Sequence, residues 1–196
     1  HGPWYMAGML VMGVDENGLG PRLGPMVASS VALETPRYQR SSLCARGLAL
    51  GLTDIKETGG FGRMGFTESV ALALLSRVSG APAPTSVDEL LERVYPGAGR
   101  ALRAPCPDEA SSSQCWGADL RLPLFGGDPE YGADLLDRLV GRSGLRIVDV
   151  QSRLACAGTL NAKLADGTNK LGVDLELVEE LIGSVHRRRG APLLTV

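Results

Sequence analysis

Two short apolar runs, joined by a connection rich in glycine and proline, constrain the fold more than any other feature of the chain. The first run extends from Met9 to Val14 and the second from Met26 to Leu33. Runs of this length bounded by Gly and Pro predict two buried strands with a tight connection between them. We therefore expect the fold to begin with an antiparallel pair of strands.

Two adjacent acids, Asp15 and Glu16, follow the first run. An acid at the end of an apolar strand is costly to desolvate unless it is paired, hydrogen-bonded or bound to a cation. If the strand continues through both residues, their side chains point to opposite faces, whereas a turn could bring both carboxylates to one site. The alternative is a glycine-rich hairpin whose acids only cap or solvate a turn.

The stretch from residue 13 to residue 25 resembles the opening signature of the ribonuclease HII family. It reads GVDENGLGP followed by Gly24-Pro25, and the family signature reads G-x-D-E-A-G-R-G-P, then G-P and a hydrophobic strand. The resemblance implies an α/β fold of the ribonuclease H-like kind, a mixed sheet flanked by helices. It also implies an endonuclease that hydrolyses the RNA strand of RNA–DNA hybrids with Mg²⁺ or Mn²⁺.

The family's chemistry assigns roles to the two acids. Two-metal hydrolysis of a phosphodiester needs about four acidic ligands around cations about 4 Å apart. Asp15 and Glu16 match the first two acids of the family, so the resemblance implies that both are catalytic and bind metal.

Two positions depart from the family signature. The family's alanine is Asn17 here, and its arginine is Leu19. The resemblance implies that Gly18 and Gly20 contact the ribose at an RNA–DNA junction through their backbone. Leu19 removes a possible phosphate contact, which Arg22 could replace. The preference between a full hybrid and a duplex with one embedded ribonucleotide therefore stays open.

A second, looser match is the sequence Asp54-Ile55-Lys56, where the family has D-S-K. The resemblance implies that Lys56 lies near the acidic site and positions a substrate phosphate. A lysine beside clustered carboxylates is electrostatically favourable. The alternative for Lys56 is a solvated loop charge.

The third metal ligand has two possible places. Asp149 lies in an apolar run that suits a central strand, which makes it a candidate ligand. The order of the expected elements favours another place, because it resembles the family's succession of strand, asparagine turn, helix and central strand, here at 144–156, Asn161, 174–189 and 191–196. On that alignment the third acid falls at or just after Val196, and Asp149 is an edge-strand acid facing solvent. The 196 residues would then lack C-terminal elements of the fold and could be inactive as a fragment.

Local signals predict four helices, from their caps and apolar periodicity. Their first residues or caps are Thr67, Ser86, Asp128 and Asp174. The segment 34–40 is polar and turn-like, the segment 41–52 is mixed, and Leu160-Asn161 is followed by the polar turn ADGTN, so we predict no helix in these stretches. The basic run from His186 to Arg189 complements the dipole of the last helix, with a nucleic-acid patch as the alternative.

Composition sets the wider expectations. The segment 1–8 resembles a tag-like leader, residues 9–196 form one domain, and residues 98–127 are an insertion. Four widely spaced cysteines are no disulfide framework, which favours a reducing, cytoplasmic setting. Cys106 and Cys115 have eight residues between them, too many for a zinc knuckle. No apolar run reaches the roughly 18 residues of a membrane span, and we expect a monomer.

A hypothesis of another class is a non-catalytic nucleic-acid-binding module with the same fold. It is motivated by Leu19 and by the incomplete set of acids. It predicts salt-dependent binding of an RNA–DNA hybrid or duplex that needs no divalent metal.

Overall fold

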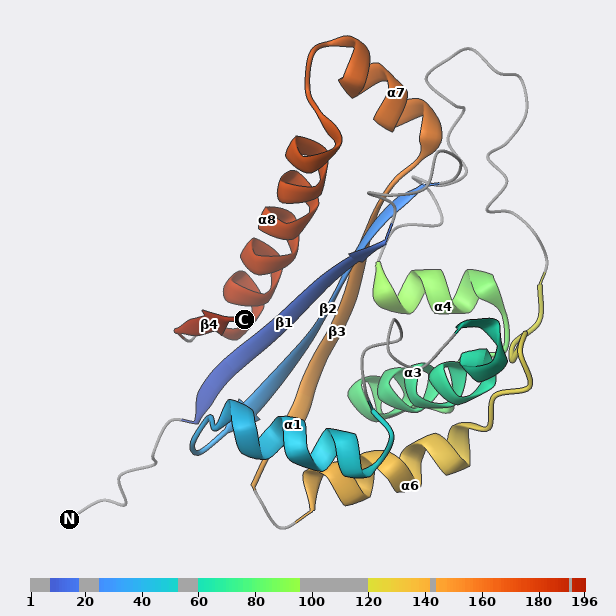
Figure 1. Ribbon diagram of the computed structural model, residues 1–196, viewed down its shortest axis with the longest axis vertical. Helices are drawn as coiled ribbons and strands as arrows, with labels where there is room; N and C mark the ends of the chain where they lie inside the picture. Colours follow the sequence, from blue (N-terminus) through green and yellow to red (C-terminus); the bar gives the residue numbers. More distant parts are fainter. Residues whose placement is uncertain (1–7, 18–24, 53–59, 96–119, 142–143, 191) are drawn as a thin grey trace.

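The computed structural model describes residues 8–17, 25–52, 60–95, 120–141, 144–190 and 192–196 (Figure 1). The predicted substrate-binding residues lie outside these ranges, as does most of the expected insertion. These residues are Gly18, Leu19, Gly20, Arg22 and Lys56.

A four-stranded mixed sheet with helices on both faces makes this an α/β fold. The strand order is β3-β2-β1-β4. Strand β1 (Met9–Asn17) pairs antiparallel with β2 (Met26–Thr35), which confirms the predicted pair. Strand β3 (Arg146–Ala155) pairs antiparallel with β2, and β4 (Leu193–Thr195) pairs parallel with β1. The carboxyl ends of β1 and β4 therefore lie at the same edge of the sheet.

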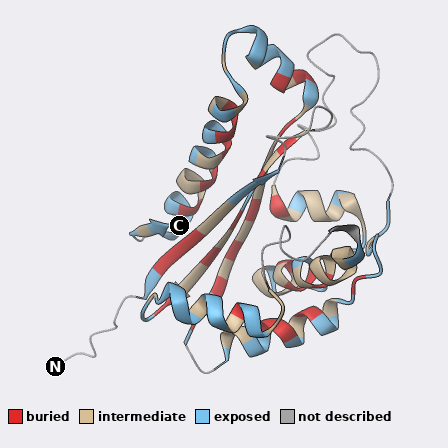
Figure 2. Cartoon of the chain, viewed as in Figure 1, coloured by how far each residue is buried: buried red, intermediate tan, exposed pale blue. Residues whose placement is uncertain are grey.

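The helices form two layers around this sheet (Figure 1). One layer holds α1 (Arg40–Ala49), α3 (Met64–Ser79) with the short helix η1 (Gly60–Arg63) before it, α4 (Val87–Val94) and α6 (Pro129–Val140). The other face carries α8 (Lys170–Arg189), reached through α7 (Ala157–Ala165). Figure 2 shows buried residues along the strands and along the side of α8 that faces them. Each face of the sheet thus has its own apolar core.

Side-chain alternation along β1 and β2 divides the residues between the two cores. Leu10 and Met12 pack with Leu181 of α8, whereas Val31 and Leu33 pack toward α3 and α6. The even positions of β1 therefore face α8.

A β-bulge changes this alternation in β3. The register shifts between Ala32 and Leu33 of β2, which pair with Asp149 and Ile147, so that Val148 is an extra residue. Val148 packs in the core on the α8 side, while Ile147 packs in the other core. After the bulge, Asp149 and every second residue beyond it face α8.

Two of the predicted caps, Ser86 and Asp128, form hydrogen bonds as expected. Ser86 Oγ accepts from the Glu89 N–H at 3.2 Å, and Asp128 Oδ1 accepts from the N–H groups of Glu130 and Tyr131 at 2.9 and 3.3 Å. Gly80 and Gly190 end α3 and α8 with left-handed backbone conformations, with φ of 65° and 60°.

Four expectations about the elements are wrong. Helices α1 and α7 form where the sequence predicts no helix, and α3 begins at Met64, three residues before Thr67. Helix α8 begins at Lys170 and not at Asp174, because Asn169 is its N-cap and accepts from the Gly172 N–H at 2.8 Å. Asp174 therefore lies inside the helix, in its second turn.

Candidate acidic site

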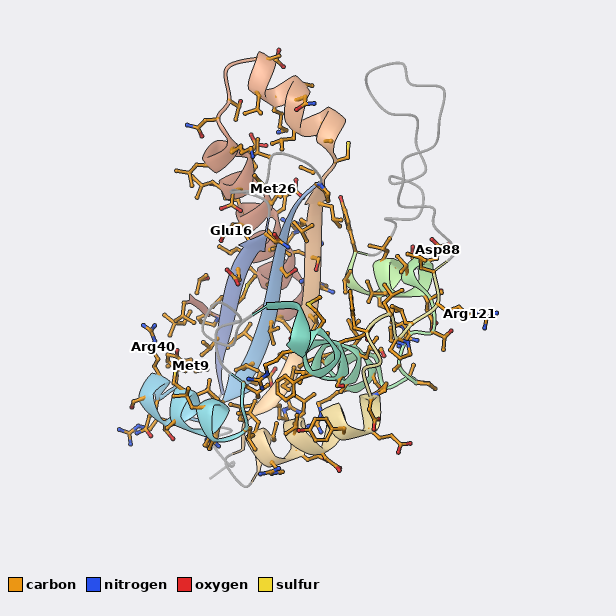
Figure 3. The ribbon with its side chains drawn as sticks, turned by 45° about the vertical axis from the view of Figure 1, so that its right-hand side comes forward. Met9, Glu16, Met26, Arg40, Asp88 and Arg121 are labelled. Atoms are coloured by element: carbon orange, nitrogen blue, oxygen red, sulfur yellow. The ribbon has the colours of Figure 1, made fainter. Side chains whose placement is uncertain are left out.

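Asp15 and Glu16 lie at the carboxyl end of β1, and both are exposed. Figure 3 shows Glu16 at the same end of the sheet as Met26, with Met9 and Arg40 at the opposite end. The strand continues to Asn17, so the two acidic side chains alternate between faces. Glu16 has the parity of Met12 and faces the α8 side. A backbone hydrogen bond to Asp15 Oδ1 from the Glu16 N–H, at 3.0 Å, holds the first carboxylate close to the chain.

The structure adds a third carboxylate, Asp174 of α8, which the sequence predicts as a helix N-cap. Its residue is 7% exposed, and its Oδ1 atom is buried without a hydrogen-bond partner among the described residues. Burial, together with the negative charges of Glu16 and then Asp15, raises the pKa of Asp174 above its ordinary value. The side chain therefore lies within electrostatic reach of both acids of the signature.

Helix periodicity explains why Asp174 points inward. Val173 and Leu177 are buried in the core between α8 and the sheet, at 1% and 8% exposure. Asp174 lies one residue after Val173 and one turn before Val178, on the border of this apolar side. The packing of α8 thus fixes a carboxylate near the end of β1.

Asp149, the other metal ligand expected from the sequence, lies elsewhere. It is in register with Ala32 of β2, which pairs with Met12 of β1. Strands are about 4.8 Å apart, so Asp149 is roughly 10 Å from β1 across the sheet, and it is level with Met12. The structure therefore does not bring Asp149 to Asp15 and Glu16.

The expectation that Asp149 faces solvent is also wrong. It is 4% exposed, and it lies between Arg188 of α8 and a pocket that residues of α3 and α4 also line. Its two carboxylate oxygens accept from Nη2 of Arg188, at 2.8 Å for Oδ2 and 3.1 Å for Oδ1. Arg189 also donates to the Val148 carbonyl, so part of the basic end of α8 binds β3, while His186 is exposed.

The described residues contain no group of three or more His, Cys, Asp or Glu side chains arranged to hold a metal ion. The negative charges of Asp15 and Glu16 thus act on Asp174, but the three carboxylates are not arranged as a coordination shell. Their chemistry still suits a hard divalent cation, because carboxylate oxygens are the ligands that Mg²⁺ and Mn²⁺ prefer.

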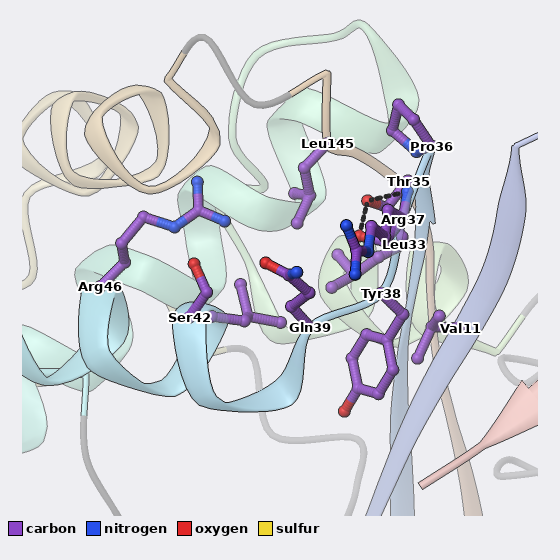
Figure 4. A pocket seen from close by; sticks show the side chains of 11 residues that line it. Val11, Leu33, Thr35, Pro36, Arg37, Tyr38, Gln39, Ser42, Arg46 and Leu145 are labelled. Carbon is purple, nitrogen blue, oxygen red and sulfur yellow. Dashed lines mark hydrogen bonds between the residues drawn. The ribbon is translucent and has the colours of Figure 1, made fainter.

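A cavity of about 370 Å³ lies toward the opposite end of the β1–β2 pair, between α1 and the sheet (Figure 4). Its lining includes Arg37, Tyr38 and Arg46, and none of its lining residues is Asp or Glu. Val11 reaches it from β1, four residues or about 13 Å before Asp15. This cavity carries arginines on a lining that is partly apolar, and it is separate from the acidic site.

Comparison of the chain with protein-family models, with curated proteins and with solved structures gives no match. No helix within the described ranges has the length and apolarity needed to cross a membrane.

Proposed function

We propose that this chain is a ribonuclease HII-like endonuclease that cuts the RNA strand of RNA–DNA hybrids with Mg²⁺ or Mn²⁺. The observation that carries the proposal is the position of Asp15 and Glu16. The signature resembling the family places them in sequence, and both are exposed at the carboxyl end of β1, an interior strand of the sheet.

The topology supports a ribonuclease H-like reading of the fold. Strand β1 lies between an antiparallel partner, β2, and a parallel partner, β4, and helices cover both faces. The connection from β3 to β4 runs through the helix α8, as the resemblance implies. The expected asparagine turn differs, because Asn161 lies in the helix α7, and β4 is an outer strand of the described sheet and not a central one. The carboxyl end of β4 also points toward the edge that carries the acids.

The proposed chemistry divides between the acids and the substrate contacts. Bound Mg²⁺ or Mn²⁺ would supply an activated water and stabilise the leaving oxygen of the RNA strand. Asp15 and Glu16 would hold the cation and orient the attacking water. Gly18, Gly20, Arg22 and Lys56 would contact ribose and phosphate, as the resemblance implies.

The test is cleavage of two labelled substrates, a full RNA–DNA hybrid and a DNA duplex with one embedded ribonucleotide. Each is incubated with Mg²⁺, Mn²⁺ or EDTA. We expect metal-dependent cleavage by the wild-type chain and a loss of about 10²–10³-fold in Asp15→Asn, because removing one principal electrostatic group typically costs this much.

The matched control is Asp134→Asn, which removes an exposed acid from α6 on the other face of the sheet. It should cleave at the wild-type rate. Cleavage by Asp15→Asn at that rate would contradict the mechanism. Metal-independent, salt-dependent binding without any cleavage would instead support the non-catalytic binding module.

A further inference from the structure

The packing of α8 buries Asp174 but gives its Oδ1 atom no hydrogen-bond partner among the described residues. An ionised carboxylate that loses its water destabilises the protein unless a partner replaces that water. Asp149, the other buried carboxylate beside α8, has such a partner in Arg188. The uncharged Gln151 is satisfied in part, because its Oε1 accepts from Ser184 Oγ at 2.8 Å while its Nε2 has no partner among the described residues. Asp174 Oδ1 has none among the described residues, and the two charges acting on its carboxylate are both negative.

We propose that Asp174 is the third carboxylate of a divalent-cation site formed with Asp15 and Glu16, to which it contributes its buried oxygen Oδ1. A cation placed between the end of β1 and α8 would give this oxygen the partner that it lacks. It would also relieve the repulsion among the three acids. The proposal rests on the proposed function and assigns a ligand from a helix that the signature does not include.

The three acidic side chains differ in how tightly packing holds them, and one fixed carboxylate beside exposed ones suits the binding of a cation. Asp174 is fixed by the packing of Val173 and Leu177 against the sheet. Asp15 and Glu16 are exposed, and neither forms an ion pair with a described side chain. Glu16 already faces α8, and its exposed side chain can turn toward a cation held at Asp174 at little cost. Asp15 starts on the other face of β1 and would reach the same cation only around the end of the strand.

The set of donors fits a hard cation. Carboxylates give an all-oxygen site, which Mg²⁺ and Mn²⁺ prefer over the nitrogen and sulfur ligands typical of zinc. Mn²⁺ is the better probe, because its binding to oxygen ligands can be followed directly by electron paramagnetic resonance.

The experiment measures Mn²⁺ binding to the whole chain without nucleic acid, by calorimetry and by electron paramagnetic resonance. The variants are Asp174→Asn, Glu16→Gln and Asp149→Asn, with Glu179→Gln as the control for loss of an exposed acid from α8. We expect Asp174→Asn and Glu16→Gln each to weaken Mn²⁺ binding by about tenfold or more. Asp149→Asn and Glu179→Gln should bind like the wild type.

Thermal unfolding separates a lost ligand from a damaged fold. In EDTA, Asp174→Asn should raise Tm by about 2–4 °C, because an amide of the same shape removes a buried, unpaired charge. In excess Mn²⁺ the same variant should lose most of the Tm increase that the metal gives the wild type. A residue with only a structural role would change Tm in the same direction in EDTA and in Mn²⁺. A higher Tm in EDTA together with a smaller gain from Mn²⁺ therefore identifies a lost ligand.

Two results would overturn the proposal: wild-type Mn²⁺ affinity in Asp174→Asn, or a loss of affinity in Asp149→Asn alone.

Failure of this inference is distinct from failure of the proposed function. If Asp174→Asn binds normally while Asp15→Asn abolishes cleavage, the nuclease stands without this ligand. If Mn²⁺ binding depends on Asp174 but no substrate is cut, the cation site stands and the nuclease does not.

Discussion

Asp149 and Asp174 are both buried carboxylates on the α8 side of the sheet, but their surroundings differ. Asp149 has a guanidinium partner, whereas the charges acting on Asp174 are those of Glu16 and Asp15. Asp149 therefore stabilises the native packing, whereas the ionised carboxylate of Asp174 destabilises the folded state unless a cation is bound. The same residue type thus serves structure at one end of α8 and a candidate site at the other.

The Asp149–Arg188 pair allows a test at the scale of single residues. Arg188→Met should lower the free energy of unfolding by about 1–3 kcal/mol, because it leaves a buried carboxylate without its donor. We expect this and not the larger loss of a fully buried pair, because the Arg188 side chain is 46% exposed. Urea unfolding at pH 7 measures the change.

The matched control is Arg187→Met, which removes a neighbouring arginine that is exposed on the same helix. It should change stability by less than about 0.5 kcal/mol. Adding Asp149→Asn to Arg188→Met should restore part of the loss. A double variant no more stable than Arg188→Met would show that the carboxylate charge is not the cause.

At the scale of elements, the packing of α6 on α3 depends on one glycine. A Cβ atom at Gly132 would lie 2.1 Å from the Ser69 carbonyl oxygen, which is backbone and cannot turn aside. Gly132→Ala should therefore destabilise the protein by about 1–3 kcal/mol, since the two helices must move apart. Thermal or urea unfolding would measure this.

Gly183 of α8 offers the same substitution in another setting. A Cβ atom there would lie 3.1 Å from Nη1 of Arg187, the far end of a flexible side chain. Gly183→Ala should stabilise by about 0.5–1 kcal/mol, because alanine is the better helix former. Equal effects of the two substitutions would mean that the close approach at Gly132 is not tight.

Elements with local signals were predictable from the sequence, and elements without them were not. The β1–β2 pair, the caps Ser86 and Asp128 and the end at Gly190 are all encoded by neighbouring residues. Helix α1 has no side-chain cap and no acid in its first turn, so nothing marked its beginning. Helix α7 is capped by the Cys156 sulfur, which accepts from the Thr159 N–H at 3.3 Å and is an unusual cap.

The candidate site was predictable only in its β1 half for a similar reason. Asp15 and Glu16 carry a sequence signature, but Asp174 looks like an N-cap when the helix is judged from its own residues. Its role depends on Asn169, which starts the helix one turn earlier, and on the strand that α8 packs against. Neither relation is local in sequence.

At the scale of the whole molecule, strand β2 contributes residues to both apolar cores. Strand β2 is hydrogen-bonded to β1 on one side and to β3 on the other along nearly its full length, whereas β4 pairs with β1 over three residues. We expect the amides of β2 to exchange with solvent most slowly, because their exposure requires the loss of two strand pairings. The amides of β4 should exchange faster.

Hydrogen exchange followed by NMR or mass spectrometry under native conditions would measure this order. Helix α8, which covers β2 and β3, serves as the internal reference for the layer above the sheet. Equal protection of β4 and β2 would contradict the expectation and would mean that the short parallel strand opens only with the whole fold.

The bulge at Val148 places two consecutive residues of β3, Val148 and Asp149, on the same face of the sheet. Before it, Ile147 faces α3 and α6; after it, Asp149 and every second residue meet α8. Deleting this one residue would keep Ile147 toward α3 and Asp149 toward α8, because regular alternation places neighbouring residues of a strand on opposite faces. The extra residue therefore adds one valine to the core on the α8 side and leaves the face of every other residue of β3 unchanged.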